Sequence, residues 1–301
     1  RGISLDNKGN LVVIGDFENH MVFGATTLAP GSKWVGDIFV AKLNSNGKWL
    51  WAKRAGSPNT GDLGRSIAVD RQGNIIIVGD FINKADFGHI TLTSFGSAAF
   101  FIAKLDPNGK WLWAKSGGGH PGHDSVGGVA IGKQNHIYIT GYYRSQARFG
   151  STTLTSGKDH HIDASLFVAK LDSNGKWLWA ESAVQDYSVG PDSSAGLDIA
   201  LDIHENIAVV GVFRKTAWFG KTKLSGKKDS IIVTKLDSNG KWLWAKQADS
   251  EESDRGLGIA VDLQGNVHVT GYFWKTATFH TTKRASKGLM DVFWWKIKNS
   301  P

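Results

Sequence analysis

The sequence predicts an all-β fold, a five-bladed β-propeller of four-stranded antiparallel blades in which the last blade lacks its fourth strand. One observation is an octapeptide, NGKWLWAK at 46–53, 108–115 and 239–246, which returns as NGKWLWAE at 174–181. Another is a block that ends in an equivalent lysine, spaced by 62, 66, 65 and 61 residues, at Lys42, Lys104, Lys170, Lys235 and Lys296. A repeat of about 60 residues built from short strands is typical of a propeller or a solenoid.

Each repeat is predicted to hold four strands, which in the second repeat are SIAVD (66–70), NIIIVGDF (74–81), FFIAKLD (100–106) and WLWAK (111–115). The segment D-x-x-G-N separates the first two strands, and D-x-N-G-K separates the last two. Asp at the start and Gly near the end favour a tight hairpin turn, because Gly accepts a positive φ. Calcium binding is the alternative for these acidic clusters, but the D-x-D-x-D-G spacing of a calcium loop does not occur.

The strands IIIV, FFIA and WLW are apolar at successive positions instead of alternating with polar residues. Such a strand is buried on both faces, and a propeller blade achieves this by packing between two neighbouring blades. We therefore predict that Trp49 and Trp51 point to one blade interface and Leu50 to the opposite one. Five recurring aromatic residues are also predicted to pack in the core: Phe23, Phe87, Phe149, Phe219 and Phe279.

The repeat makes the chain a single domain, with blades at about 1–64, 65–127, 128–196, 197–256 and 257–301. In the fifth blade, the segment DVFWWKI is not followed by a copy of the octapeptide. Because an open sheet edge invites pairing with another chain, we expect a W-x-W-A-like strand from upstream of Arg1 to complete this blade. Without such a strand, self-association through the open edge of blade five is expected.

Composition narrows the class of partner. The chain carries a net charge of +8 and no cysteine, which excludes disulfides and thiolate metal sites. A basic protein can attract anionic partners such as nucleic acid or polysaccharide, but the lysines recur with the repeat instead of clustering, which favours a solubilising role over nucleic-acid binding. No apolar run approaches the roughly 18 residues of a membrane helix, so membrane insertion is not expected.

The pattern G-I-A-V-D-x-x-G-N-x-x-V-T-G-Y-F, followed by F-V-A-K-L-D-x-N-G, resembles the SBBP-type β-propeller repeats of bacterial surface and secreted proteins. The resemblance spans essentially all 301 residues. It implies an extracellular or cell-surface location, often as part of a larger protein, and it brings no shared catalytic motif. The family name implies seven blades where five repeats are found here, and the fifth repeat replaces FVAKL with FWWKI.

The loops after the second and fourth strands should share one end of the blades, called the long-loop rim below, and the short turns should share the other, called the turn rim. Variable loops on a repeated scaffold usually carry binding, so we expect a specific ligand on the long-loop rim. Two of these loops gather histidine and aspartate, which suit zinc. The metal-site candidates are His120, His123, Asp124, His160, His161 and Asp163. Solvated polar loops are the alternative, and no cofactor is predicted.

Other residues break the repeat near the same rim. Asp198 stands where the other repeats have Gly or Ser, and it is the one catalytic candidate, since first strands would face the central opening. Glycan hydrolysis needs at least two carboxylates with different pKa values, so a hydrogen-bonded structural aspartate is the alternative. Exposed aromatic and basic residues can stack sugars, although burial under the loops is the alternative for the tryptophans. The ligand-binding candidates are Asp16, Asp80, Tyr142, Arg144, Arg214, Trp218, Tyr272 and Trp274.

Three classes of function therefore stay open. The favoured class is a non-enzymatic recognition, adhesion or scaffold module that binds a protein or glycan at a cell surface. The second is a glycan-binding lectin or a glycan-cleaving enzyme that uses the central opening near Asp198. The third is a structural assembly module. Identity between repeats is concentrated in strands and turns, which weakens the case for repeated sugar pockets between blades.

Overall fold

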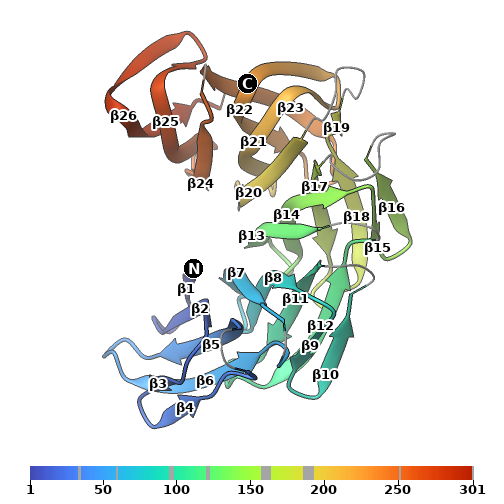
Figure 1. Cartoon of the computed structure of the whole chain (residues 1–301), viewed down its shortest axis with the longest axis vertical. Helices are drawn as coiled ribbons and strands as arrows, with labels where there is room; N and C mark the ends of the chain where they lie inside the picture. Colours follow the sequence, from blue (N-terminus) through green and yellow to red (C-terminus); the bar gives the residue numbers. More distant parts are fainter. Residues whose placement is uncertain are drawn as a thin grey trace.

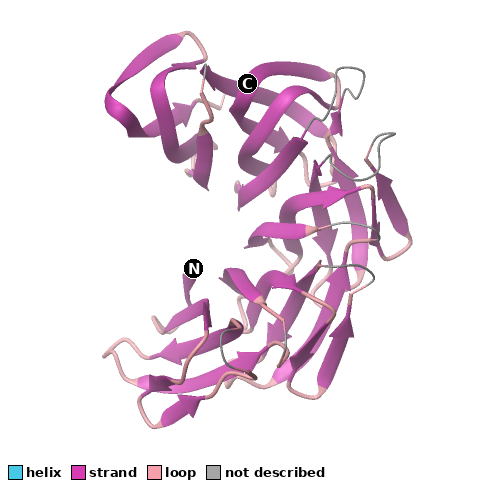
Figure 2. Ribbon diagram, viewed as in Figure 1, coloured by secondary structure: helices cyan, strands magenta, loops and turns pink. Residues whose placement is uncertain are grey.

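The computed structural model describes residues 1–32, 35–58, 60–94, 98–119, 123–156, 164–185, 193–250 and 252–299. These residues form strands joined by turns and loops, with no helix among them (Figure 2). The described part of the chain accordingly holds no helix that could cross a membrane. The predicted all-β class is confirmed.

Five repeat units follow one another along the described residues, and within each unit the main strands pair antiparallel in chain order. Unit one consists of β1 (Gly2–Leu5), β2 (Leu11–Phe17), β5 (Asp37–Leu43) and β6 (Trp49–Ala55). Unit two consists of β7 (Leu63–Val69), β8 (Ile75–Phe81), β11 (Ala99–Leu105) and β12 (Trp111–Gly117). Unit three consists of β13 (Ser125–Ile131), β14 (Ile137–Arg144), β17 (Ala164–Leu171) and β18 (Trp177–Ser182).

The last two units contain longer strands. Unit four consists of β20 (Ser193–Leu201), β21 (Ile207–Phe219), β22 (Thr222–Leu236) and β23 (Trp242–Ser250). Unit five consists of β24 (Arg255–Val261), β25 (Val267–Phe279) and β26 (Thr282–Ile297), and no fourth strand follows among the described residues.

A small hairpin, absent from the four-strand prediction, joins the second and third strands of each unit. It is a separate two-stranded sheet in three units: β3 (Met21–Phe23) with β4 (Thr26–Leu28), β9 (Lys84–Phe87) with β10 (Ile90–Thr93), and β15 (Gln146–Phe149) with β16 (Thr152–Thr155). In units four and five it is continuous with β21–β22 and β25–β26. Each hairpin ends its first strand with one of the five recurring phenylalanines, all of which are buried, so their predicted packing role is confirmed.

The units form an arc around a common centre, with units one and five on either side of its open end (Figure 1). The first strands lie next to one another, since β7 contacts β1 and β13, and β20 contacts β13 and β24. The strand order of each sheet places the fourth strand at the opposite, outer edge. Side chains on first strands and at the adjoining ends of second strands are therefore the ones near the centre.

Apolar side chains of facing sheets form a buried core between each pair of neighbouring units. In unit two, every residue of β8 and β11 is buried, which confirms burial on both faces. The prediction for the tryptophan pair was wrong: Trp49 packs on the face of unit one that points away from unit two, whereas Trp51 packs against the core shared with unit two. Leu50 is exposed. The cause is a register shift between Lys42 and Leu43, which rotates β6 between its two tryptophans.

Four of the five third-strand lysines, Lys42, Lys104, Lys170 and Lys235, are buried, so the solubilising interpretation is wrong for them, whereas Lys296 in unit five is exposed. In unit two, Lys104 Nζ lies 3.0 Å from Asp70 Oδ2 and donates to the backbone carbonyl of Ser173 in unit three at 3.2 Å. Asp70 also accepts hydrogen bonds from the backbone N–H groups of Gln72 and Asn74, which fixes the D-x-x-G-N turn as predicted. A buried ammonium is tolerated because it is paired and hydrogen-bonded. The same ion pair, at 2.9 Å, joins Lys42 to Asp6 and Lys235 to Asp202.

Unit three departs from this arrangement, because Gly132 stands where the other units have the turn aspartate. Its third-strand lysine, Lys170, lies over the ring of Tyr138, with Nζ 4.9 Å from the ring centroid. Burial lowers the pKa of Lys170, against the opposing field of Glu205 in unit four. Unit three thus lacks the turn carboxylate of the buried ion pair, and in unit five the equivalent pair, Lys296 with Asp262 at 3.5 Å, is partly exposed.

Candidate functional site

The long-loop rim is a set of loops that reach from one unit to the hairpin of the next. The backbone N–H of Gly56, which follows β6, donates to Asp86 in hairpin strand β9 at 3.0 Å. β19 (Val184–Gln185) pairs with β21, and the end of β23 pairs with β25. The loops after fourth strands and the hairpins after second strands therefore share one rim, as predicted.

A recurring buried aspartate fixes each described loop to the end of a second strand. Asp62 accepts hydrogen bonds from the backbone N–H of Ser57 at 2.7 Å and of Ile82 at 3.2 Å. Asp254 accepts one from the backbone N–H of Trp274 at 3.0 Å. Burial raises the pKa of Asp62 to about 7, although its backbone hydrogen bonds oppose the shift. These aspartates hold the loops on the scaffold and leave the loop sequences free to differ.

Asp124, one of the metal-site candidates, belongs to this set. Its carboxylate is buried and accepts hydrogen bonds from the backbone N–H of Gly119 at 2.7 Å and of Arg144 at 2.9 Å. Burial raises its pKa to about 6. His123 next to it is exposed. The other candidates, His120, His160, His161 and Asp163, lie outside the described residues, and the residues that are described contain no group of three or more side chains able to hold a metal ion.

A cluster of charged and polar groups lies where the rim meets the centre of the arc, and is called the inner cluster below. Asp80, at the end of β8, accepts hydrogen bonds from Arg65 Nε at 2.7 Å and from the hydroxyl of Ser125 at 2.9 Å. The backbone N–H of Val126 donates to the same carboxylate at 3.2 Å. Asp80 therefore links unit two to the first strand of unit three. Burial raises the pKa of Asp80, against the effect of the Arg65 guanidinium.

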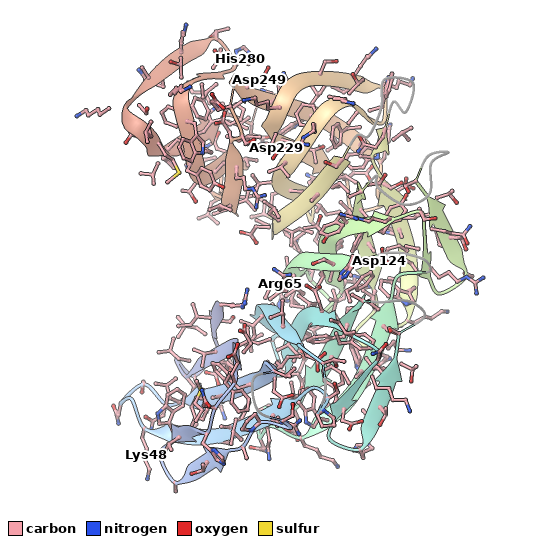
Figure 3. All side chains as sticks on the ribbon, viewed as in Figure 1. Lys48, Arg65, Asp124, Asp229, Asp249 and His280 are labelled. Carbon is pink, nitrogen blue, oxygen red and sulfur yellow. The ribbon has the colours of Figure 1, made fainter. Side chains whose placement is uncertain are left out.

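Two further candidates belong to the inner cluster. Asp16 pairs with Arg1 in unit one in the way that Asp80 pairs with Arg65 in unit two. Tyr142 lies opposite Ser125 in the β13–β14 pairing. Burial raises the pKa of Tyr142, and the negative field of Asp80 adds to that shift. Arg65 keeps about a third of its side chain exposed and lies on the inner side of the arc (Figure 3).

The remaining candidates are not brought into this cluster. Arg214 donates to Asp229 at 2.8 Å within unit four, and the Trp218 ring on the same unit's hairpin faces Lys223 Nζ, 4.8 Å from the ring centroid. Tyr272 lies opposite Arg255 in unit five, and Trp274 there is half-buried. Trp218 therefore lies on the hairpin of unit four and Trp274 just before the hairpin of unit five, and neither is fully exposed.

Asp198 lies on the innermost strand of unit four, as predicted. Its carboxylate accepts hydrogen bonds from the backbone N–H of Ile199 at 2.9 Å and from that of Ile259 in unit five at 3.0 Å. Burial raises its pKa, and both backbone hydrogen bonds oppose the shift. The carboxylate thus links the first strands of units four and five. This is the arrangement expected for a hydrogen-bonded structural aspartate, the alternative to a catalytic role.

Sequence reasoning missed Arg1, Arg65 and Ser125. A signal for the arginines was present in the repeat. Arg1 and Arg65 are equivalent residues near the start of the first strand, and they occur in the two repeats that have aspartate as the penultimate residue of the second strand. The other three repeats have Gly127, Leu197 and Leu257 at that position, with Tyr or Val in place of the aspartate.

Comparison with known proteins supports the architecture. No family profile matches the chain. An uncharacterised WD repeat-containing protein of Acanthamoeba polyphaga mimivirus is 28% identical over 207 residues, which are 59% of this chain and 14% of that protein. A polysaccharide lyase, an ulvan lyase, superposes with a TM-score of 0.55 at 11% identity, over 98% of this chain and 66% of that one. A protein of unknown function from Dyadobacter fermentans gives a TM-score of 0.51 at 11% identity, over 92% of this chain and 77% of that one.

The chain therefore has a propeller-like all-β repeat fold. It spans just under two thirds of the lyase chain and about a seventh of the viral protein. WD repeats contribute four strands to each blade of a propeller, which matches the four main strands of units one to four.

Proposed function

We propose that the chain is a single β-propeller domain of the SBBP type, with its five units as blades, and that it acts as a non-enzymatic recognition, adhesion or scaffold module at a bacterial cell surface. The binding surface is the long-loop rim. The observation that carries this proposal is the contrast between the two ends of each unit. The turn rim carries short turns of two recurring types, D-x-x-G-N and D-x-N-G-K, with few changes between units. The long-loop rim places different loops on the same buried aspartate anchors, Asp62, Asp124 and Asp254.

The inner cluster is the part of this rim best suited to a polar ligand. Arg65 uses Nε and one terminal nitrogen for Asp80, and a guanidinium has five N–H donors, so donors remain for a ligand. The carboxylate holds the guanidinium in place, which reduces the entropy lost on binding. Tyr142 adds an aromatic surface and a hydroxyl beside it. Hydroxyl-rich or anionic glycans, and acidic protein segments, are the ligands that such donors accept.

A glycan array, followed by titration of each bound glycan, tests the proposal. Arg65→Lys keeps the charge but removes the planar pair of donors, and we expect it to weaken binding at least tenfold. Lys48→Ala, on the exposed turn rim of unit one (Figure 3), is the matched control and should leave affinity unchanged. Loss of binding in the Lys48 variant together with normal binding in the Arg65 variant would place the function on the turn rim.

A lectin or glycan-cleaving enzyme at the central opening near Asp198 is the second candidate. The structural neighbour named as a polysaccharide lyase favours it, since one structure of that lyase is described as bound to a GlcA(1-4)Rha3S unit. Incubation of bound glycans with the chain, with product analysis by mass spectrometry, separates the two candidates. Chain cleavage that is lost in Asp198→Asn would favour the enzyme, and intact glycan would favour the binding module.

A further inference from the structure

Unit five carries an unpaired strand edge beside a cavity. Within the described residues β26 pairs with β25 alone, whereas β5, β11, β17 and β22 each pair with a fourth strand on their other side. A cavity of about 510 Å³ follows this edge, and Phe279, His280, Phe293 and Trp295 are among its lining residues. Backbone N–H and C=O groups along such an edge pair readily with an added strand.

Trp295 takes over a contact that a fourth-strand tryptophan makes in the other units. The hairpin phenylalanine of units one to four meets the first tryptophan of the octapeptide edge to face, with ring centroids 4.9 to 5.5 Å apart. In unit five, the equivalent Phe279 meets Trp295 edge to face at 5.7 Å. Trp295 lies on the third strand, at a position that is Ala41, Ala103, Ala169 or Thr234 elsewhere. The space for a fourth-strand indole is therefore filled from within unit five.

His280 narrows the space for the same indole from a second direction. The residue after the hairpin phenylalanine is glycine in units one to four, with φ between 61° and 66°. A Cβ added to Gly88 would lie 2.6 Å from Trp111 Cδ1, and one added to Gly220 would lie 2.8 Å from Trp242 Cβ. The contact would be 3.1 Å at Gly150 and an ordinary 3.4 Å at Gly24. Unit five has His280 at this position, with φ 56°, and its Cβ occupies the space that the glycines leave open. His280 lies on the outer part of unit five (Figure 3).

We propose that the β26 edge is a docking site for an extended peptide strand that has a small residue in place of the first tryptophan of NGKWLWAK. The β22–β23 pairing gives the register, because Leu236 there lies opposite Trp242 and Lys235 lies opposite Trp244. By equivalence, the small residue lies opposite Ile297, and a tryptophan opposite Lys296 is accepted. This replaces the expected W-x-W-A-like strand with a different partner, one that cannot be a copy of the repeated octapeptide.

Two peptides, NGKWLWAK and NGKALWAK, test the proposal on the 301-residue chain. Hydrogen exchange should show protection of the 291–297 amides by the alanine peptide, and anisotropy of labelled peptides should show at least a tenfold preference for it. In the double variant His280→Gly and Trp295→Ala, which restores the residues of units one to three, the preference should reverse. Urea titration verifies that this variant folds.

Controls separate strand pairing from general apolar binding. A backbone N-methylated alanine peptide cannot pair with the edge and should not bind. Equal binding of NGKWLWAK to the unchanged chain, binding of the methylated peptide, or no protection of β26 by the alanine peptide would each overturn the proposal. Sedimentation of the chain alone tests whether a second copy of this chain occupies the β26 edge. A dimer that the alanine peptide dissociates would assign the edge to a second copy of this chain and overturn its assignment to a separate strand.

Discussion

Replacement of Lys104 by methionine tests whether the buried ion pairs stabilise the repeat. The variant keeps most of the aliphatic stem but leaves Asp70, whose side chain is fully buried, without its ammonium at 3.0 Å. Removing one partner of a buried pair costs about 3–5 kcal/mol. Asp70 keeps hydrogen bonds from Gln72 and Asn74, so we expect the lower end of that range, about 3 kcal/mol. Loss of the hydrogen bond to the Ser173 carbonyl adds about 1 kcal/mol.

Lys170→Met is the matched control that the chain itself supplies. Gly132 replaces the turn aspartate in unit three, so this substitution leaves no turn carboxylate unpaired. The variant loses the contact between Lys170 and the Tyr138 ring, worth about 0.5–2 kcal/mol, and the hydrogen bond from Lys170 to the Ser238 carbonyl at 3.4 Å. It also removes the cost of a buried charge. We expect a net change within about 1 kcal/mol.

Urea titration followed by tryptophan fluorescence measures both changes, with the m-value checked for constant unfolding behaviour. A third variant, Lys104→Met with Asp70→Asn, should recover part of the loss. An asparagine can hold such a turn, since Asn44 accepts the N–H groups of Asn46 and Lys48 in the turn after β5. Equal losses for the Lys104 and Lys170 variants would refute the assignment of the stabilisation to the ion pair.

Three further predictions concern stability and binding. Burial raises the pKa of Asp62 to about 7 and of Asp124 to about 6, so protonation of these groups favours the fold. The free energy of unfolding should therefore fall as pH rises from about 4 to 7 through Asp62 and from about 4 to 6 through Asp124, by up to about 1.4 kcal/mol per pH unit for each group. Asp62→Asn should flatten this slope in urea titrations at several pH values. Trp111→Ala removes a buried indole 5.3 Å from the Phe87 ring and should cost about 3–5 kcal/mol, whereas a loss below about 1 kcal/mol would contradict the packing assigned to β12. Alanine at the exposed turn lysines Lys48, Lys110, Lys176 and Lys241 should change only salt-dependent association, while alanine substitution of the loop that contains Asp124 should abolish ligand binding in the same titration.

The sequence predicted the features that short-range patterns determine. Strand boundaries, the Asp-to-Gly turns and burial on both faces follow from local composition, and β8 and β11 are buried throughout. The small hairpins were missed because strands as short as Met21–Phe23 and Thr26–Leu28 resemble ordinary loop sequence. Both tryptophans of the octapeptide were predicted to face the same interface, because side chains of a regular strand alternate between its two faces. The bulge in the strand pairing that breaks this alternation has no sequence signature.

Long-range partners were harder to predict. A lysine in a strand normally indicates a side chain that faces solvent. The aspartate that permits burial of Lys104 comes 34 residues earlier in the chain. The inner cluster required the same kind of pairing, between Arg65 and Asp80 and then with Ser125 of the next unit. Comparison of repeats could have found the pair of Arg65 with Asp80, because Arg1 and Asp16 repeat it. It could not have found the contact of Asp80 with Ser125, because Ser125 contributes only to the interface between units two and three.

Where two residues that differ from their equivalents in the other repeats lie next to each other, packing explains both. Asp198 is not part of such a pair. Its two hydrogen bonds go to the backbone N–H groups of Ile199 and Ile259, and equivalent amides exist in units whose residue at this position is Gly or Ser. Contacts between the other units therefore form without a carboxylate at this position, and the link that Asp198 makes is particular to units four and five. We predict that Asp198→Ser, which copies unit two, lowers the free energy of unfolding by no more than about 2 kcal/mol, as expected for two lost hydrogen bonds of about 1 kcal/mol each. If the central opening holds the ligand, the same variant should lower affinity at least tenfold in titrations against the glycan that the array identifies. A large loss of stability would instead show that the carboxylate serves the contact between units four and five, and the case for a site at the centre would then depend on the inner cluster alone.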